Sequence, residues 1–230
     1  MAQFTKSWKL ALGLSVFRKR LLFTVVLLVA TLFCYRLFLE LVEHRPGIVF
    51  RDPFLSLFTP VNLSLIAYTL IYGGLILGAV VLSTDPLRLL RVLQAYVILL
   101  LLRIAFMYFL PLDPPATVVP MKDPVFEFLG LKAVLTRDLF FSGHIASLFL
   151  LGLAMPWRDL RIGFYSCAAI VGLLMLLQHV HYTIDVISAP CVAYAAYGLA
   201  GIHAIKEYPP VRDTKEAQQA SNLRVEKASR

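Results

Sequence analysis

Two short clusters of polar residues interrupt a largely apolar sequence, and each combines histidine with an acidic residue. Residues 137–144 read Arg-Asp-Leu-Phe-Phe-Ser-Gly-His, and residues 179–185 read His-Val-His-Tyr-Thr-Ile-Asp. Titratable groups beside membrane-length apolar segments are costly to place there and usually have a function. The residue types indicate a site at which a phosphoryl group is transferred through a histidine.

The four-residue spacing of His181 and Asp185 indicates a nucleophilic histidine that is oriented by a carboxylate. Residues four apart share one face of a helix, so the Asp185 carboxylate can accept a proton from one imidazole nitrogen of His181. The other nitrogen is then unprotonated and free to attack phosphorus. Alternatively, Asp185 only stabilises a helix N-terminus through the helix dipole, but that interpretation leaves His181 without a role.

The first cluster supplies the complementary groups. Ser142 and Gly143 are placed to begin a helix, whose first backbone N–H groups favour a phosphate. In the alternative interpretation, Ser142 is only the N-cap of that helix. His144 follows in the first turn and is the candidate general acid for a leaving alkoxide.

Arg103 lies inside an apolar segment, about 10 Å below its predicted outer end. An arginine at this depth requires a partner, and either a substrate phosphate or Asp138 would serve. Arg103 and Asp138 are therefore candidate phosphate-binding residues. The alternative is an ion pair that only fixes helix packing.

The remaining polar groups of the second cluster allow other interpretations. Tyr182 is a candidate substrate-binding residue, although it also suits an aromatic belt at the membrane interface. His179 could bind zinc with His181 and Asp185. Residues two apart face different sides of a helix, so this alternative is disfavoured, and we expect neither a metal nor another cofactor.

The composition determines which elements must position these residues. The chain has 230 residues, is 59% hydrophobic and has a mean hydropathy of +0.76, whereas soluble domains are about 45–50% apolar. We therefore predict an all-α integral membrane protein, a bundle of six transmembrane helices. The predicted spans are 21–42, 61–82, 89–110, 140–155, 162–178 and 183–204.

The basic residues predict the orientation of this bundle. The net charge is +8, and lysine and arginine flank the apolar runs, which favours an anionic membrane surface over nucleic acid as the partner. Their bias places both termini in the cytoplasm and both histidine clusters on the external face. We thus expect a basic amphipathic stretch at 1–20, a catalytic bundle at 21–205 and a polar cytoplasmic tail at 206–230. A proline-rich external loop, 111–139, joins the third and fourth helices.

The two clusters also carry a family resemblance. The run from Asp138 to His144 resembles the Asp-x-x-x-Ser-Gly-His motif of sphingomyelin synthases, and residues 181–185 resemble their His-Tyr-Thr-x-Asp motif. Arg103 followed by Leu110 and Pro111 is similar, more loosely, to the motif that ends their third helix. The resemblance covers residues 100–204 and extends to the broader type 2 phosphatidic acid phosphatase group.

The resemblance implies a specific reaction. A phosphocholine, phosphoethanolamine or related head group would pass from a glycerophospholipid to a lipid alcohol such as ceramide, without a metal. His181 would carry the phosphoryl group, Asp185 would orient His181, and His144 would move the proton. The expected partners are thus membrane lipids.

Departures from the family pattern keep two alternatives open. The Lys-x6-Arg-Pro run of the phosphatase branch is missing. The Pro-Pro-Leu-Pro-Asp motif of animal synthases is also missing, and residues 112–115 resemble it only weakly. These absences suggest a minimal relative whose acceptor lipid the sequence does not determine. One alternative is a lipid phosphate phosphatase or phospholipase C-like hydrolase with the same site. The other is a non-enzymatic transporter or membrane scaffold.

Overall fold

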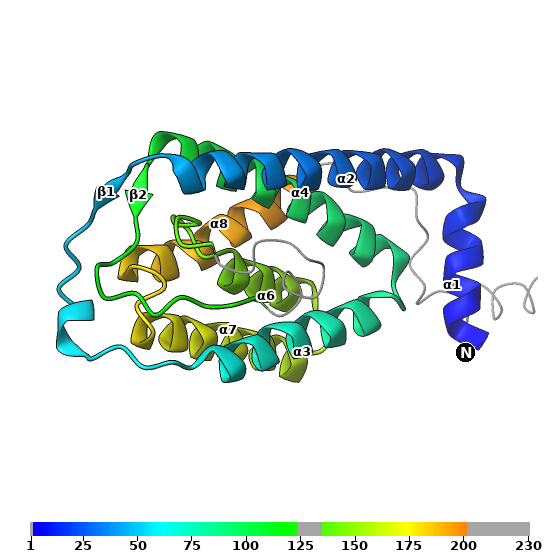
Figure 1. Ribbon diagram of the computed structural model, residues 1–230. Coiled ribbons are helices and arrows are strands. Elements are labelled where there is room, and N and C mark those ends of the chain that lie inside the picture. Colours follow the sequence, from blue (N-terminus) through cyan, green and yellow to red (C-terminus); the bar gives the residue numbers. More distant parts are fainter. Residues whose placement is uncertain (1, 124–134, 202–230) are drawn as a thin grey trace, which may run out of the picture.

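The computed structural model describes residues 2–123 and 135–201, and nearly all regular structure in them is helical (Figure 1). The helices are α1 (Ala2–Gly13), α2 (Ser15–His44), α3 (Ser64–Leu82), α4 (Pro86–Phe109), α6 (Gly143–Ala154), α7 (Arg158–Leu177) and α8 (Thr183–Gly201). A 3-10 turn (Leu55–Leu57) and the two-residue strands β1 (Ile48–Val49) and β2 (Leu112–Asp113) complete the described structure. The predicted all-α class is thus confirmed.

Five of these helices are long and apolar enough to cross a membrane, namely α2, α3, α4, α7 and α8. Their outward side chains are largely apolar and solvent-accessible; Phe23 is 68% exposed and Leu65 is 81% exposed. Soluble proteins rarely expose apolar surface of this extent, whereas lipid-facing helices require it. The protein is therefore of the multi-pass membrane type.

The segment predicted as the fourth span forms α6, which is shorter than expected. Its 12 residues extend about 18 Å, compared with a hydrocarbon core of about 30 Å. The count of six spans therefore stays a prediction. The same holds for the external loop at 111–139, because residues 124–134 lie outside the described residues.

The predicted boundary at residue 20 does not coincide with a structural boundary. Gly13 ends α1 and Ser15 begins α2, so the basic residues 18–20 belong to the long second helix. Arginine and lysine are good helix formers, and nothing in this stretch interrupts the helix. The predicted tail, 206–230, and His203 lie outside the described residues.

Helix α6 lies at the centre of the bundle, where it packs against α3, α4, α7 and α8 (Figure 1). Seven of its 12 residues are buried. Helix α8 presents a buried stripe of alanines with helical spacing, which lets neighbouring backbones approach closely. The stripe consists of Ala189, Ala193, Ala196 and Ala200.

The loops at one end of the bundle form a hydrogen-bonded scaffold. β1 pairs in parallel with β2, and the Glu43 carboxylate accepts hydrogen bonds from the backbone N–H groups of Thr136 and Arg137. Arg137 in turn contacts Asp113 through Nε over 2.6 Å. These contacts attach the segment that enters α6 to the end of α2 and to β2.

The carboxylate of Asp52 caps α8 from a different loop. It accepts hydrogen bonds from the Thr183 backbone N–H over 2.6 Å and from the Thr183 hydroxyl over 3.1 Å. Partial burial raises the pKa of Asp52, but these hydrogen bonds outweigh it and hold the pKa below its usual value. The start of α8, which follows the second histidine cluster, is therefore fixed from outside its own helix.

Candidate active site

The two histidine clusters meet where α6 begins and α7 turns into α8. The backbone N–H of Ser142, which precedes α6, donates a hydrogen bond to the Asp185 carbonyl oxygen over 3.2 Å. This contact joins two motifs more than forty residues apart in sequence. The prediction that both clusters lie at the same end of the bundle is confirmed.

His181 and Asp185 adopt the predicted pairing. Nδ1 of His181 lies 3.2 Å from Oδ2 of Asp185, and both side chains are buried. The same Oδ2 accepts the backbone N–H of Tyr182 over 3.1 Å, which fixes the carboxylate. The contact favours the tautomer with the proton on Nδ1 and leaves the lone pair of Nε2 available.

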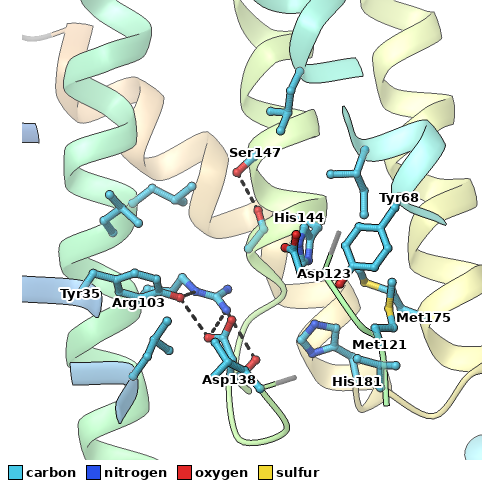
Figure 2. A pocket seen from close by; sticks show the side chains of 18 of the residues that line it. Tyr35, Tyr68, Arg103, Met121, Asp123, Asp138, His144, Ser147, Met175 and His181 are labelled. Carbon is cyan, nitrogen blue, oxygen red and sulfur yellow. Dashed lines mark hydrogen bonds and ion pairs between the residues drawn. The ribbon is translucent and has the colours of Figure 1, made fainter. Parts of the chain in front are cut away.

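His144 occupies the first turn of α6 and lines the same cavity as His181 (Figure 2). Its ring meets the ring of Tyr68 edge to face, with centroids 6.2 Å apart. Because one imidazole comes from α6 and the other from the turn between α7 and α8, the cavity between them can receive a group that both contact.

The cavity has a volume of about 260 Å³ and is walled by α2, α3, α4, α6 and the segment around Val180. Much of its wall is apolar or aromatic, which suits a lipid glycerol and the start of its acyl chains. Its polar lining consists of Arg103, Asp123, Asp138, His144, Ser147 and His181. Five of the six therefore carry titratable groups.

Arg103 is buried and holds the entry to α6. Its Nη2 forms an ion pair with Asp138, its Nη1 donates to the Phe141 carbonyl, and its Nε donates to the Tyr35 hydroxyl over 2.7 Å. The predicted partner Asp138 is thus confirmed. A phosphate-binding role for either residue stays a prediction.

Asp138 is held in its ionised form by this environment. Burial raises the pKa of its carboxyl, but the charge and hydrogen bond of the Arg103 guanidinium outweigh burial and lower the pKa. The Tyr35 hydroxyl also donates to Asp138 over 3.0 Å. Tyr35, Arg103 and Asp138 therefore form one network beside the cavity (Figure 2).

Gly143 is required where Arg103 crosses the start of α6. A Cβ atom at this position would lie 2.7 Å from Nη1 and 2.9 Å from Cζ of Arg103. A larger residue would therefore displace the guanidinium or the helix. The glycine of the Ser-Gly-His run has a steric reason, in addition to any contact of its backbone with a phosphate.

Besides Asp185, which contacts His181, two predicted site residues lie outside the lining of the cavity. Ser142 is the N-cap residue but makes no side-chain cap hydrogen bond; its buried hydroxyl lies 3.4 Å from Sδ of Met175. The hydroxyl of buried Tyr182 instead donates to the Asp113 carbonyl over 2.8 Å and accepts the Phe50 N–H over 3.2 Å. Neither side chain is placed to touch a substrate in this cavity, because packing directs both toward neighbouring segments.

His179 ends α7 and does not line the cavity. It adopts a φ of 56° directly after α7, its N–H bonds to the Leu176 carbonyl, and the Val180 N–H bonds to the Met175 carbonyl. This is the Schellman motif that ends many helices. Its Nδ1 lies 2.5 Å from the Thr117 hydroxyl, so His179 and His181 point to different partners.

Sequence reasoning missed several tyrosines and one aspartate of the cavity. Tyr72 donates from its hydroxyl to Asp123 over 2.7 Å, and its ring stacks on Tyr68 with centroids 5.9 Å apart. Tyr35 belongs to the Arg103 network. In the sequence these tyrosines resemble interfacial aromatics. The one signal of a site was the helical spacing of two hydroxyl-bearing residues, Tyr68 and Tyr72, within an apolar run.

Comparison of the sequence with protein-family models gives no match, and comparison with curated proteins gives no similar sequence. The likeness to sphingomyelin synthases therefore rests on the motif residues. Of these, Arg103, Asp138, Gly143, His144 and His181 line one cavity, and Asp185 contacts His181.

Proposed function

We propose that the protein is a lipid head-group phosphotransferase, which moves a substituted phosphoryl group from a glycerophospholipid to a lipid alcohol such as ceramide. One observation carries the proposal: His181, paired with Asp185, and His144 line a single cavity. A nucleophile, its orienting carboxylate and a second imidazole are the minimum that a two-step displacement requires.

In the first step, Nε2 of His181 attacks phosphorus and forms a P–N bond. The P–O bond to diacylglycerol breaks, and its electron pair stays on the glycerol oxygen. His144, in its protonated form, gives that oxygen a proton. Asp185 stabilises the positive charge that develops on His181, because its carboxylate faces Nδ1.

In the second step, His144 removes the proton from the hydroxyl of the acceptor lipid. The oxygen attacks phosphorus, the P–N bond breaks and its electron pair returns to His181. Both imidazoles are then in their starting states. A single pair of histidines thus serves both half-reactions, in accord with microscopic reversibility.

The start of α6 supports binding of the phosphoryl oxygens. The first backbone N–H groups of a helix have no intrahelical partners and carry positive partial charge, and Gly143 and His144 line the cavity at that end. Arg103 lies against Gly143 and adds positive charge beside the same place. Phosphoryl transfer depends mainly on such positioning and charge stabilisation.

An amine-bearing head group, phosphocholine or phosphoethanolamine, suits the opposite wall of the cavity. Asp123 provides a carboxylate there, and the rings of Tyr68 and Tyr72 lie beside it. Carboxylates and aromatic faces both attract ammonium groups. Exchanging Asp123 for asparagine should raise KM for phosphatidylcholine or phosphatidylethanolamine while leaving KM for phosphatidic acid unchanged.

The function is tested by product analysis with purified protein in vesicles. Head-group-labelled phosphatidylcholine or phosphatidylethanolamine is incubated with and without ceramide. We expect a labelled product that depends on ceramide, together with one diacylglycerol per turnover. Labelled free head-group ester formed without ceramide would indicate the hydrolase alternative instead.

The His181→Ala protein separates an enzyme from a transporter or scaffold. We expect it to insert and purify normally but to form no product. His179→Gly is the matched control, because it removes a neighbouring imidazole that lies outside the cavity lining and keeps the backbone conformation that glycine favours. Equal conversion by His181→Ala and wild-type protein would contradict the proposal.

A further inference from the structure

A second cavity lies at the opposite end of the bundle and is lined by arginines. It has a volume of about 370 Å³ and lies among the start of α4, the ends of α6 and α8, and the first turns of α2 and α7. Its basic lining consists of Arg20, Arg88, Arg91 and Arg161. No acidic side chain of the described residues lines it.

Arg91 is held so that part of its guanidinium faces this space. Its Cζ lies 3.8 Å from the centre of the Tyr197 ring, and its Nη2 donates to the Tyr197 carbonyl over 3.1 Å. The stacking on the Tyr197 ring and the hydrogen bond to its carbonyl hold the guanidinium at the wall of the cavity, where its Nη groups can donate to a bound anion.

Two further arginines are anchored by contacts with the protein and keep other donors for a ligand. Arg88 donates from Nη1 to the Ala154 carbonyl over 3.4 Å, and Arg161 donates from Nη2 to the Met155 carbonyl over 3.1 Å. Nε of Arg88 also pairs with Asp85 over 2.9 Å. Since a guanidinium has five N–H donors, these contacts position the arginines at the cavity without exhausting them.

Charge balance at this cavity favours an anion. Four guanidinium groups line it, no carboxylate of the described residues does, and Asp85 pairs with Arg88 from outside the lining. Guanidinium matches the geometry of phosphate oxygens and forms paired hydrogen bonds with them. Basic pockets between membrane helices commonly hold phosphorylated lipid head groups.

We propose that this arginine cavity binds a phosphate-bearing anion, at a site separate from the histidine cavity. Arg91 and Arg103 both belong to α4, and their separation of twelve positions corresponds to about 18 Å of helix. The two sites therefore lie at opposite ends of the same helices. The ligand has two possible sources, an anionic phospholipid of the leaflet at that end or a soluble phosphate compound.

The test measures ligand retention by the full-length protein in detergent. Wild-type protein is mixed with phosphatidic acid, with phosphatidylcholine or with inorganic phosphate, and bound molecules are counted by native mass spectrometry. We expect retention of phosphatidic acid that the arginine variant described below loses, whereas retention of phosphatidylcholine, the expected ligand of the histidine cavity, is equal in wild type and variant. Competition by millimolar inorganic phosphate would assign the site to soluble phosphates, whereas retention unaffected by it would assign the site to a lipid.

Arg91→Gln combined with Arg161→Gln should lower the affinity by at least about tenfold. The control is Arg18→Gln, which removes the same charge from the exposed face of α2 at the same end of the bundle. An equal loss in the control, or no retention by wild type, would overturn the proposal. Thermal unfolding gives a second readout: phosphatidic acid should raise the Tm of wild type more than that of the arginine variant, whereas phosphatidylcholine should raise both equally. An equal rise with phosphatidic acid in both proteins also overturns the proposal.

Discussion

The backbone N–H of Ser142 donates to the carbonyl oxygen of Asp185 over 3.2 Å, and this single contact couples the two histidine motifs. The carbonyl belongs to the residue whose carboxylate orients His181, and the N–H belongs to the residue that begins the helix of His144. A shift of α6 relative to α8 would therefore change both imidazoles together.

His181 is expected to be indispensable. Replacement by alanine should lower kcat for head-group transfer by at least about 10³-fold, because the covalent step is lost. Wild-type protein incubated with head-group-labelled phosphatidylcholine and denatured under alkaline conditions should carry the label as a phosphoramidate, which acid treatment then removes. Label on the His181→Ala protein at the wild-type level would contradict the assignment.

The loss of kcat on replacing His144 should be larger for donors with poorer leaving groups. With a phospholipid donor, His144→Ala should reduce kcat by about 10²–10⁴-fold, the range for loss of a general acid. With p-nitrophenyl phosphocholine, whose leaving group needs no proton, release of nitrophenolate should fall much less. Equal losses with both donors would show that His144 does not protonate the leaving group.

The Arg103–Asp138 pair tests whether these residues bind substrate or only fix the helices. Asp138→Leu should cost about 3–5 kcal/mol of stability, because it leaves a buried guanidinium without its carboxylate. The double variant Arg103→Met, Asp138→Leu should recover most of that loss. If the double variant is stable but has lost turnover, the pair binds phosphate; if kcat and KM are those of wild type, the pair serves packing.

Tyr182 should act through structure and not through substrate. Tyr182→Phe removes the hydrogen bonds to Asp113 and Phe50 and should lower stability by about 1–3 kcal/mol. We expect KM for the phospholipid to stay unchanged, measured at a temperature where the variant is folded. A raised KM at unchanged stability would restore the substrate-binding role that the sequence suggests.

Asp52 should make stability depend on pH in the acid range. Its pKa is lowered by the hydrogen bonds from Thr183, so its contribution is complete above the unfolded-state pKa of about 3.9 and is lost as the pH falls through the lower folded value. Asp52→Asn keeps a good cap but does not titrate, so its Tm should vary less between pH 5 and pH 3. An identical pH profile would contradict this role.

The sequence predicts the residues of the proposed reaction better than it predicts the residues that form the cavity wall. His181 and Asp185 are four residues apart, so local helical geometry is enough to pair them. The partnership of Arg103 with Asp138 follows from the cost of an isolated charge. Tyr35 and Tyr68 lie on two different helices, and Asp123 lies in a loop. Tertiary packing brings these residues together, and no local spacing in the sequence encodes their proximity.

Two local features of the site could not be predicted from the sequence. The apolar run at 140–155 gives no indication that the helix begins only at Gly143; Arg103 contacts Asp138 and the Phe141 carbonyl just before it. The zinc alternative for His179 is disfavoured by its two-residue spacing from His181, but that spacing does not predict the left-handed position that His179 adopts after α7, where glycine is usual.

The 12-residue length of α6 also bears on biosynthesis. A helix of this length is too short to be recognised by itself as a span during insertion. Its polar ends need shielding from neighbours, and two of these, α7 and α8, are synthesised after it. We therefore expect the candidate catalytic centre to assemble only after α7 and α8 have been synthesised, because α6 packs against both.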